Sequence, residues 1–143
     1  MPKTVLVPVD GSPQSDVALD HALDQFPDAE IVALTAVDPI AAGYSAAPGV
    51  EGGYPGEWIE QANDRADDIL NDAVEHAAEQ GREIDTVRVT DRPARAIVDY
   101  ADEEGVDHIV LGSHGRTGVT RVLLGSVAEN VVRRAPCPVT VVR

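Results

Sequence analysis

TVLVPVDGSP, residues 4–13 of the chain, joins a strand to the start of a helix. Its first six residues are continuously apolar and rich in valine, which is typical of a strand covered on both faces in the middle of a parallel sheet. Pro8 has no N–H for the ladder and is therefore expected near the strand's end. Gly11 permits a tight turn, and Ser12 before Pro13 is typical of an N-cap followed by proline at the first helical position. The stretch predicts a central strand that leads directly into a helix.

The remainder of the chain repeats this alternation. Further strands are predicted over residues 31–37, 84–89, 107–111 and 138–142, and helices over residues 13–23, 57–80, 93–104 and 126–134. The first helix is expected to bury Val17, Ala18, His21 and Ala22, and strand 84–89 is expected nearer a sheet edge. Strands that alternate with helices predict an α/β fold, a doubly wound parallel sheet with helices on both faces. With 143 residues, the chain is expected to form one domain over residues 1–143.

Composition and charge argue against several classes of function. The net charge of −14 disfavours nucleic acid as a partner, because phosphate backbones are bound by clustered Lys and Arg. No stretch approaches the roughly 18 apolar residues of a membrane span, and the first residues lack the layout of a signal peptide. We therefore expect no membrane partner and a cytoplasmic location. Cys137 is the single cysteine, which excludes an intramolecular disulfide and a cysteine-built metal cluster.

The charged residues follow an unusual pattern. Among the 11 lysine and arginine residues, Lys3 is the only lysine, and acidic residues are scattered along the chain rather than gathered in one tail. Such a charge keeps a protein soluble, but the compact state repels itself until salt screens it. The pattern predicts a salt-adapted surface and a halophilic source. A melting temperature indifferent to molar salt would exclude this hypothesis.

Residues 39–56 form a long stretch without periodicity, rich in Gly, Ala, Pro and Tyr. Loops of this length are uncommon in a compact domain and are usually functional or disordered. The segment is therefore a candidate lid over a site, and a floppy insertion explains it equally well.

Glycines punctuate the segment that follows the predicted strand 107–111. Gly112, Gly115 and Gly125 let backbone N–H groups approach an anion closely, and a helix that starts at Ser126 adds unpaired donors and the favourable end of its dipole. Ordinary turn formation is the alternative for any one of these glycines. The segment is neither a Walker loop nor a Rossmann fingerprint, because it lacks their spacing. The pattern predicts a different kind of phosphate-binding loop.

The spacing Gly-x2-Gly-x9-Gly-Ser resembles the ATP-binding motif of the universal stress protein family. The opening VLVPVDGS over residues 5–12 and the ending APCPVTVV over residues 135–142 are similar to that family too, so the resemblance covers about the whole chain. It implies the strand order 3-2-1-4-5. It also implies a site for ATP, AMP or ADP, with Mg²⁺ or Mn²⁺ bridging the phosphates.

By this resemblance, Asp10 hydrogen-bonds the ribose or adenine side of the nucleotide, and Pro8, Val9 and Val37 shape the base pocket. An ordinary turn or helix-capping role is the alternative for Asp10. The phosphate contacts, largely through backbone N–H groups, are expected from Gly112, Gly115, Gly125, Ser126 and Val127. Leu111, Ser113, His114 and Arg116 complete the predicted site. Arg116 and Arg121 either neutralise phosphate charge or are solvated loop residues, and Ser126 also fits the N-cap of the helix that follows.

The leading functional prediction is a nucleotide-dependent regulatory sensor in the stress response. The resemblance implies a homodimer through the C-terminal strand, and an unidentified protein partner is expected. The alternatives are a slow ATPase or an autophosphorylating enzyme, and a nucleotide-independent interaction protein. The intact glycine motif argues against the last. For His114, the sequence identifies no second residue that would form a catalytic pair with it. His21, His76 and His108 lack the spacing of a metal site.

Overall fold

Five parallel strands form one sheet in the part of the chain that the computed structural model describes, residues 3–39, 55–113 and 125–143. The strands are β1 (Thr4–Pro8), β2 (Glu30–Val37), β3 (Asp85–Thr90), β4 (His108–Gly112) and β5 (Val139–Val142). The helices are α1 (Pro13–Gln25), α3 (Pro55–Glu79), α4 (Pro93–Glu103) and α5 (Ser126–Arg134). The sheet order is β3-β2-β1-β4-β5, which confirms the predicted order 3-2-1-4-5.

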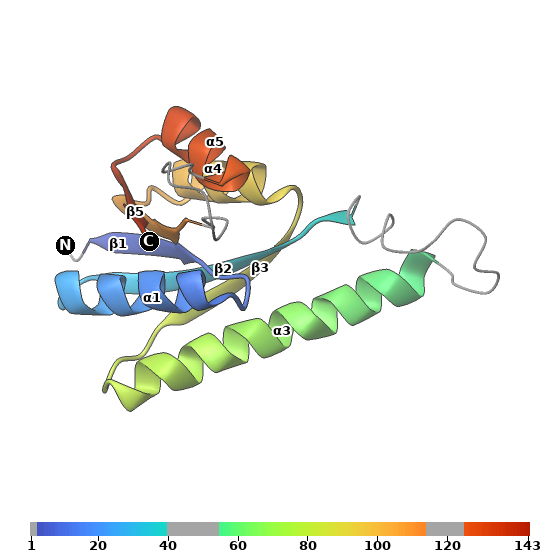
Figure 1. The fold of residues 1–143 in the computed structure, drawn as a ribbon, viewed down its shortest axis with the longest axis horizontal. Helices are drawn as coiled ribbons and strands as arrows, with labels where there is room; N and C mark the ends of the chain where they lie inside the picture. The colour runs from blue at the N-terminus through green and yellow to red at the C-terminus, as the bar shows by residue number, and fades with distance from the viewer. Residues whose placement is uncertain (1–2, 40–54, 114–124) are drawn as a thin grey trace.

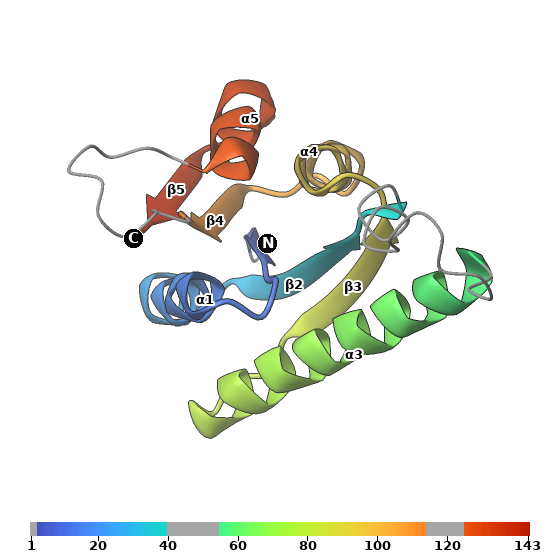
Figure 2. The same cartoon turned by 45° about the vertical axis from the view of Figure 1, so that its right-hand side comes forward.

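Helices cover both faces of the sheet, as Figures 1 and 2 show. Helices α1 and α3 lie on one face, and α4 and α5 lie on the other. Each pair packs on its own cluster of buried aliphatic side chains. The predicted doubly wound arrangement is therefore confirmed.

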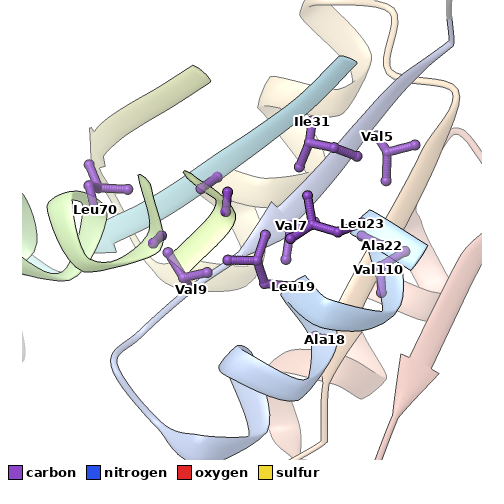
Figure 3. Packing of buried hydrophobic residues seen from close by; sticks show 13 residues of the cluster. Val5, Val7, Val9, Ala18, Leu19, Ala22, Leu23, Ile31, Leu70 and Val110 are labelled. Atoms are coloured by element: carbon purple, nitrogen blue, oxygen red, sulfur yellow. The ribbon is translucent and has the colours of Figure 1, made fainter. Parts of the chain in front are cut away.

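Strand β1 lies at the centre of the sheet, between β2 and β4. Val5, Leu6 and Val7 are all 0% exposed, because one face of β1 meets α1 and the other meets the cluster under α4 and α5. Figure 3 shows the valines of β1 against the inner side of α1. The continuous apolar run at the start of the chain is thus explained by burial on both faces.

Helix α1 begins as predicted but buries a different stripe. The Ser15 backbone N–H donates to Ser12 Oγ at 3.2 Å, and Pro13 is the first helical residue. Gly11 has a φ of +81°, a conformation that favours glycine. The prediction that Val17 is buried was wrong, because its side chain is 44% exposed. The buried stripe runs through Ser15, Ala18, Leu19, Ala22 and Leu23, and position 17 is turned about 100° away from position 18.

Helix α3 is the longest of the described helices, with 25 residues. The chain leaves it at Gly81, whose φ of +73° is the left-handed conformation that commonly ends helices. Ala66, Leu70, Ala73 and Ala77 form its buried face. Among the described residues, no helix is sufficiently long and apolar to cross a membrane.

Arg82 links the segment after α3 to the end of α1, at the amino end of the strands. Its Nη1 donates to the Leu23 carbonyl at 2.9 Å, and its Nη2 donates to the carbonyls of Phe26 and Ala29 at 3.2 and 3.1 Å. The last carbonyls of a helix have no intrahelical partner, so this guanidinium supplies donors where the helix has none, although the Phe26 carbonyl also accepts from the Ala29 N–H at 3.2 Å. Arg82 therefore acts as a cap for the end of α1 and for the turn into β2.

His108 lies at the same end of the sheet, at the first position of β4. Its Nε2 is 2.7 Å from Thr140 Oγ1 on β5, and its ring packs on Phe26 with centroids 5.0 Å apart. Burial lowers the pKa of His108, and the nearby charges of Lys3 and His21 lower it further. The neutral imidazole is therefore the favoured form in the fold.

Candidate functional site

A cavity of about 240 Å³ lies where the strand order reverses, at the carboxyl ends of the central strands. After β1 the chain builds β2 and β3 on one side, and β4 and β5 lie on the other. Open α/β sheets bind ligands in the crevice at such a switch point. The cavity is lined by Pro8, Val9, Asp10, Ser15, Leu34, Thr35, Ala36, Pro93, Ile97, Leu111, Gly112, Gly125, Ser126, Val127 and Ala128.

Three helices contribute residues of their first turns to this cavity: α1, α4 and α5. The positive ends of their dipoles therefore converge on it. Helix α1 is capped by Ser12, whereas Arg92 and Gly125 at the N-caps of α4 and α5 make no side-chain cap hydrogen bond. Helices α1 and α4 have proline in the first turn, and α5 starts with Ser126, which keeps its N–H. Thus the start of α5 offers the most backbone donors to an anion.

The N-cap of α5 is one residue earlier than predicted. Gly125 occupies that position, with φ −58° and ψ 158°, and Ser126 is the first residue of the helix. The interpretation of Ser126 as the N-cap was therefore wrong. Because Gly125 has no side chain, it leaves the first-turn N–H groups uncapped.

Asp10 forms a tight hydrogen-bonded turn at the cavity wall. Its Oδ1 accepts from the Ser12 backbone N–H at 2.9 Å, and its own N–H lies 3.4 Å from Ser15 Oγ. Ser15 Oγ in turn donates to the Ser12 carbonyl at 3.0 Å. The turn role that we considered as the alternative for Asp10 is thus present, and it holds the residue at the cavity rather than away from it.

Gly112 is required by packing between β4 and α1. A Cβ at this position would lie 2.4 Å from the Gln14 carbonyl oxygen and 2.6 Å from the carbonyl carbon. Any side chain at 112 would therefore force the first turn of α1 away from the end of β4. The structure gives this glycine a reason that does not involve an anion, and the close approach brings the Asp10 turn beside the end of β4.

Comparison with known proteins identifies the family. The model of the universal stress protein family matches residues 1–143. The chain belongs to the universal stress protein family. It is 37% identical over 147 residues to universal stress protein MJ0531 of Methanocaldococcus jannaschii, an alignment that covers 99% of this chain and 82% of the relative.

Two solved structures are similar to this chain along nearly their whole lengths. MJ0577 of the same organism has a TM-score of 0.80 and 30% identity, and the match covers 99% of this chain and 96% of that one. A universal stress protein in complex with cAMP has a TM-score of 0.72 and 29% identity, with 99% and 97% covered. These likenesses agree with the fold described above.

Most of the predicted site residues within the described part of this universal stress protein line the cavity. These are Pro8, Val9, Asp10, Leu111, Gly112, Gly125, Ser126 and Val127. Val37 is buried at the end of β2, where its carbonyl accepts from the Asp91 N–H at 3.0 Å, and it is not among the lining residues. Ser113 is also buried outside the lining, with its N–H donating to the Val142 carbonyl at 2.8 Å. His114, Gly115, Arg116, Arg121 and residues 40–54 of the candidate lid (39–56) lie outside the described residues, and the lid's last two residues, 55 and 56, belong to α3 instead of a loop.

The sequence did not predict the lining residues that come from β2, nor several that come from helices α1, α4 and α5. The residues missed are Ser15, Leu34, Thr35, Ala36, Pro93, Ile97 and Ala128. One signal was available, because Thr35 is the only polar residue between Ile31 and Val37 in an otherwise apolar strand. The others are ordinary core residues whose place at the cavity follows from the sheet order.

The chemistry of the described lining is simple. Asp10 is its only ionisable side chain, and the rest of the lining is aliphatic or carries hydroxyl groups. Within the described residues, no group of three His, Cys, Asp or Glu side chains is arranged to hold a metal ion. The site therefore offers an apolar slot, hydroxyls and backbone donors, which suits binding of a flat apolar ring with an anionic tail.

Proposed function

We propose that this universal stress protein binds an adenine nucleotide, with ATP as the main ligand and AMP or ADP as competitors, and acts as a regulatory sensor in the stress response. The observation that carries the proposal is the uncapped start of α5 at a switch-point cavity. Backbone N–H groups and a helix dipole there match a phosphate group. The family relative solved with cAMP, at 29% identity, supports an adenine nucleotide as the ligand class.

The arrangement of the lining suggests how the nucleotide is oriented. Its phosphates are placed on the first turn of α5, where Ser126, Val127 and Ala128 present backbone N–H groups. Its base is placed in the apolar slot that includes Leu34 and Ile97. Mg²⁺ or Mn²⁺ is then held chiefly by phosphate oxygens, since Asp10 is the only carboxylate of the described lining.

We favour sensing over catalysis because of what the lining contains. Hydrolysis or phosphate transfer requires a general base beside the nucleophile. In the described lining Asp10 is the only ionisable group, and its carboxylate already accepts the Ser12 N–H. A sensor instead requires that the nucleotide prefer one conformation, and bound phosphates fix the first turn of α5.

We further propose a homodimer through β5, acting in the cytosol where the nucleotide pool lies, with an unidentified protein partner as the reader. Among the described strands, β5 pairs with β4 alone and lies at the edge of the sheet. Its four residues, Val139–Val142, are all partly exposed. An apolar edge strand of this kind is a template for pairing with another chain.

Two variants at one position test the phosphate placement. Ser126→Pro removes the N–H and the hydroxyl at the first position of α5, yet proline fits there and the extended backbone of Gly125 tolerates it. Ser126→Ala removes only the hydroxyl. Calorimetric titration with MgATP in high salt should give binding by wild type, and about tenfold or more weaker binding by Ser126→Pro.

Adenosine serves as the ligand-side control, because it lacks phosphates. Its affinity should be unchanged by Ser126→Pro, and Ser126→Ala should lie between wild type and Ser126→Pro for MgATP. A folded wild-type protein that binds no adenine nucleotide would overturn the proposal and leave a nucleotide-independent interaction protein. Conversion of bound ATP to ADP at a steady rate would favour the enzyme.

A further inference from the structure

Strands β3 and β5 form the two edges of the sheet in the described part of the chain, and the proposed function uses only β5. Figure 2 shows them at opposite sides of the sheet. Strand β3 pairs with β2 alone among the described strands, in a continuous register from Val32↔Asp85 to Val37↔Thr90. Its six residues include no proline, and this register contains no bulge. With six residues against four, β3 is the longer of the two edges.

The register identifies which backbone groups of β3 face away from the sheet. The Val37 carbonyl accepts from the Asp91 N–H at 3.0 Å, and Val37 is paired with Thr90. In a parallel ladder, alternate residues direct both their N–H and their C=O groups to the same neighbouring strand. The odd-numbered residues of β3 therefore point to β2, and Thr86, Arg88 and Thr90 point away from it. No described residue forms a hydrogen bond with the backbone groups of these three.

The edge of β3 also lacks the usual obstacles to pairing with another chain. Proteins commonly block an edge strand with charged side chains, because unpaired ladder groups otherwise bind a further strand. Arg88 is the only charged residue among the three that point away from β2. Its Nη1 donates to Asp67 Oδ1 on α3 at 2.7 Å, so its guanidinium is held against that helix and is neutralised there. Thr86, Arg88 and Thr90 are all exposed, which leaves the edge accessible.

The two faces of β3 differ in the side chains that they offer beside this edge. Val87 and Val89 pack on the aliphatic cluster under α4 and α5, and both stay partly exposed. Tyr100 of α4 packs on the same cluster. The contact between Arg88 and Asp67 places the other three side chains of the alternation, which are polar, on the α3 face. A strand that alternates apolar and polar side chains would therefore match both faces.

Charge favours a foreign segment over a second copy of this chain at β3. The chain carries a net charge of −14, so two copies repel each other. Strand β3 has two valines among its six residues, whereas β5 has three among four, so β3 offers less apolar surface to offset that repulsion. Burial, followed by the nearby carboxylates of Glu104 and Asp85, raises the pKa of Tyr100, and these carboxylates make the α4 side of the edge acidic. A basic segment is attracted to such an edge.

We propose that the edge of β3 is a docking site for an extended segment of a protein partner, which alternates apolar with basic side chains and adds to the sheet as a further strand. The backbone of the segment pairs with the outward groups of Thr86, Arg88 and Thr90. Its apolar side chains lie beside Val87 and Val89, and its basic side chains lie on the α3 face. The inference rests on the proposed function only for the partner's role as reader, because docking itself requires no nucleotide.

A synthetic peptide of alternating valine and lysine, about seven residues long with blocked ends, tests the docking site. Wild-type protein should bind the labelled peptide, as measured by fluorescence anisotropy in the high salt of the ATP titration, which screens non-specific attraction. A peptide that is N-methylated at the amides facing β3 keeps the charge and the apolar side chains but loses the ladder donors. It should bind at least about tenfold more weakly. A valine–glutamate peptide should also bind more weakly, and equal binding would overturn the basic character of the segment.

Two variants at one position test the edge from the protein's side. Thr86→Pro removes an outward N–H that pairing with β2 does not use, so the variant should remain folded. Its affinity for the valine–lysine peptide should fall about three- to tenfold. Thr86→Ser keeps the N–H, and as the matched control it should bind the peptide as wild type does.

Amide hydrogen exchange locates the bound peptide. In the free protein the N–H groups of Thr86, Arg88 and Thr90 should exchange faster than those of Val87 and Val89, and the peptide should slow the exchange of the first three. Protection of the β5 amides instead would overturn the inference, as would equal binding of the N-methylated peptide or no binding by folded wild-type protein.

The failures of the two proposals are distinguishable, because none of these peptide experiments includes a nucleotide. Protein that binds MgATP but not the peptide overturns the docking site and leaves nucleotide binding intact. Protein that binds the peptide at β3 but no adenine nucleotide supports the docking site and overturns the nucleotide-dependent function.

Discussion

The two ends of the sheet differ in how their polar groups are satisfied. At the amino end the chain pairs its own groups: Arg82 donates to three carbonyls, and the Thr4 N–H donates to Asp107 Oδ2 at 2.8 Å. At the carboxyl end, α4 and α5 both start without a side-chain cap hydrogen bond. The amino end stabilises the fold by itself, whereas in our proposal a bound nucleotide completes the carboxyl end. Variants at the two ends should therefore have separable effects on stability and affinity.

The largest effect is expected at Gly112, where thermal stability and affinity for ATP should fall together. Gly112→Ala places a methyl group against the Gln14 carbonyl, and relief of such overpacking costs about 3 kcal/mol and lowers the melting temperature by roughly 6–12 °C. Because α1 carries the Asp10 turn, affinity for ATP should fall as well. Thermal unfolding and calorimetry on one preparation measure both.

Gly81→Ala is the control for Gly112. Gly81 has a φ of +73° and nothing within 4 Å of an added Cβ, so its substitution costs about 1 kcal/mol of backbone strain without a clash. It lies away from the cavity lining and should not affect ATP binding. If Gly112→Ala were no more destabilising than Gly81→Ala, the contact between β4 and α1 would be looser than described.

Removal of the cap at the amino end should affect stability alone. Arg82→Met keeps the aliphatic stem but leaves the carbonyls of Leu23, Phe26 and Ala29 without this donor. We expect a loss of about 2 kcal/mol and a fall in melting temperature of roughly 4–8 °C. The affinity for MgATP should be unchanged at a temperature where the variant is folded. A matched loss of affinity would contradict the separation of the two ends.

The smallest effect is the pH dependence that His108 contributes at the amino end. Its folded pKa is lowered from 6.5, chiefly by burial, so the unfolded chain binds the proton more readily. The stability contributed by the neutral ring is present above pH 6.5 and is lost as the pH falls toward the lowered folded value. The groups facing the ring are Thr140, Phe26, Lys3 and His21. His108→Gln should reduce the loss of melting temperature between pH 8 and pH 5, compared with wild type.

His76 provides an internal comparison of opposite sign. Its Nε2 lies 2.5 Å from Asp20 Oδ1, and this hydrogen bond raises its pKa above 6.5. The stability that it contributes is present below pH 6.5 and is lost as the pH rises through the raised folded value. The contribution is small, because both side chains are partly exposed. His76→Gln should therefore lower the melting temperature more at pH 5 than at pH 8, and equal losses at both pH values would argue against this titration.

The sequence predicted the elements well because their signals are local. The apolar run before Asp10 and the Ser12–Pro13 start of α1 each depend on neighbouring residues, and the structure confirms them. The strand order came from the family resemblance, since alternation alone indicates only a parallel α/β sheet. Val17 was misplaced because a short helix offers more than one apolar stripe, and only packing on β1 and β4 selects one.

The site was predicted in part, for a related reason. The residues after β1 and β4 follow strands in sequence, so their place at the sheet's carboxyl edge was foreseeable. Ile97 and Thr35 reach the cavity from elements that are distant in sequence, and their types are ordinary for a helix face and a strand. Only the sheet order, which brings the ends of β1, β2 and β4 together, places them at the cavity.

The central place of β1 also has a consequence for how the chain is made. β1 is synthesised before the other four described strands, yet it pairs with β4, and the contact between Thr4 and Asp107 closes a separation of 103 residues. Until β4 is synthesised, one edge of the most apolar strand has no neighbour, and long-range parallel pairing of this kind is intrinsically slow. The nascent protein therefore carries an aggregation-prone strand for most of its synthesis, and the strand that protects it is the one whose carboxyl end lies at the proposed nucleotide site.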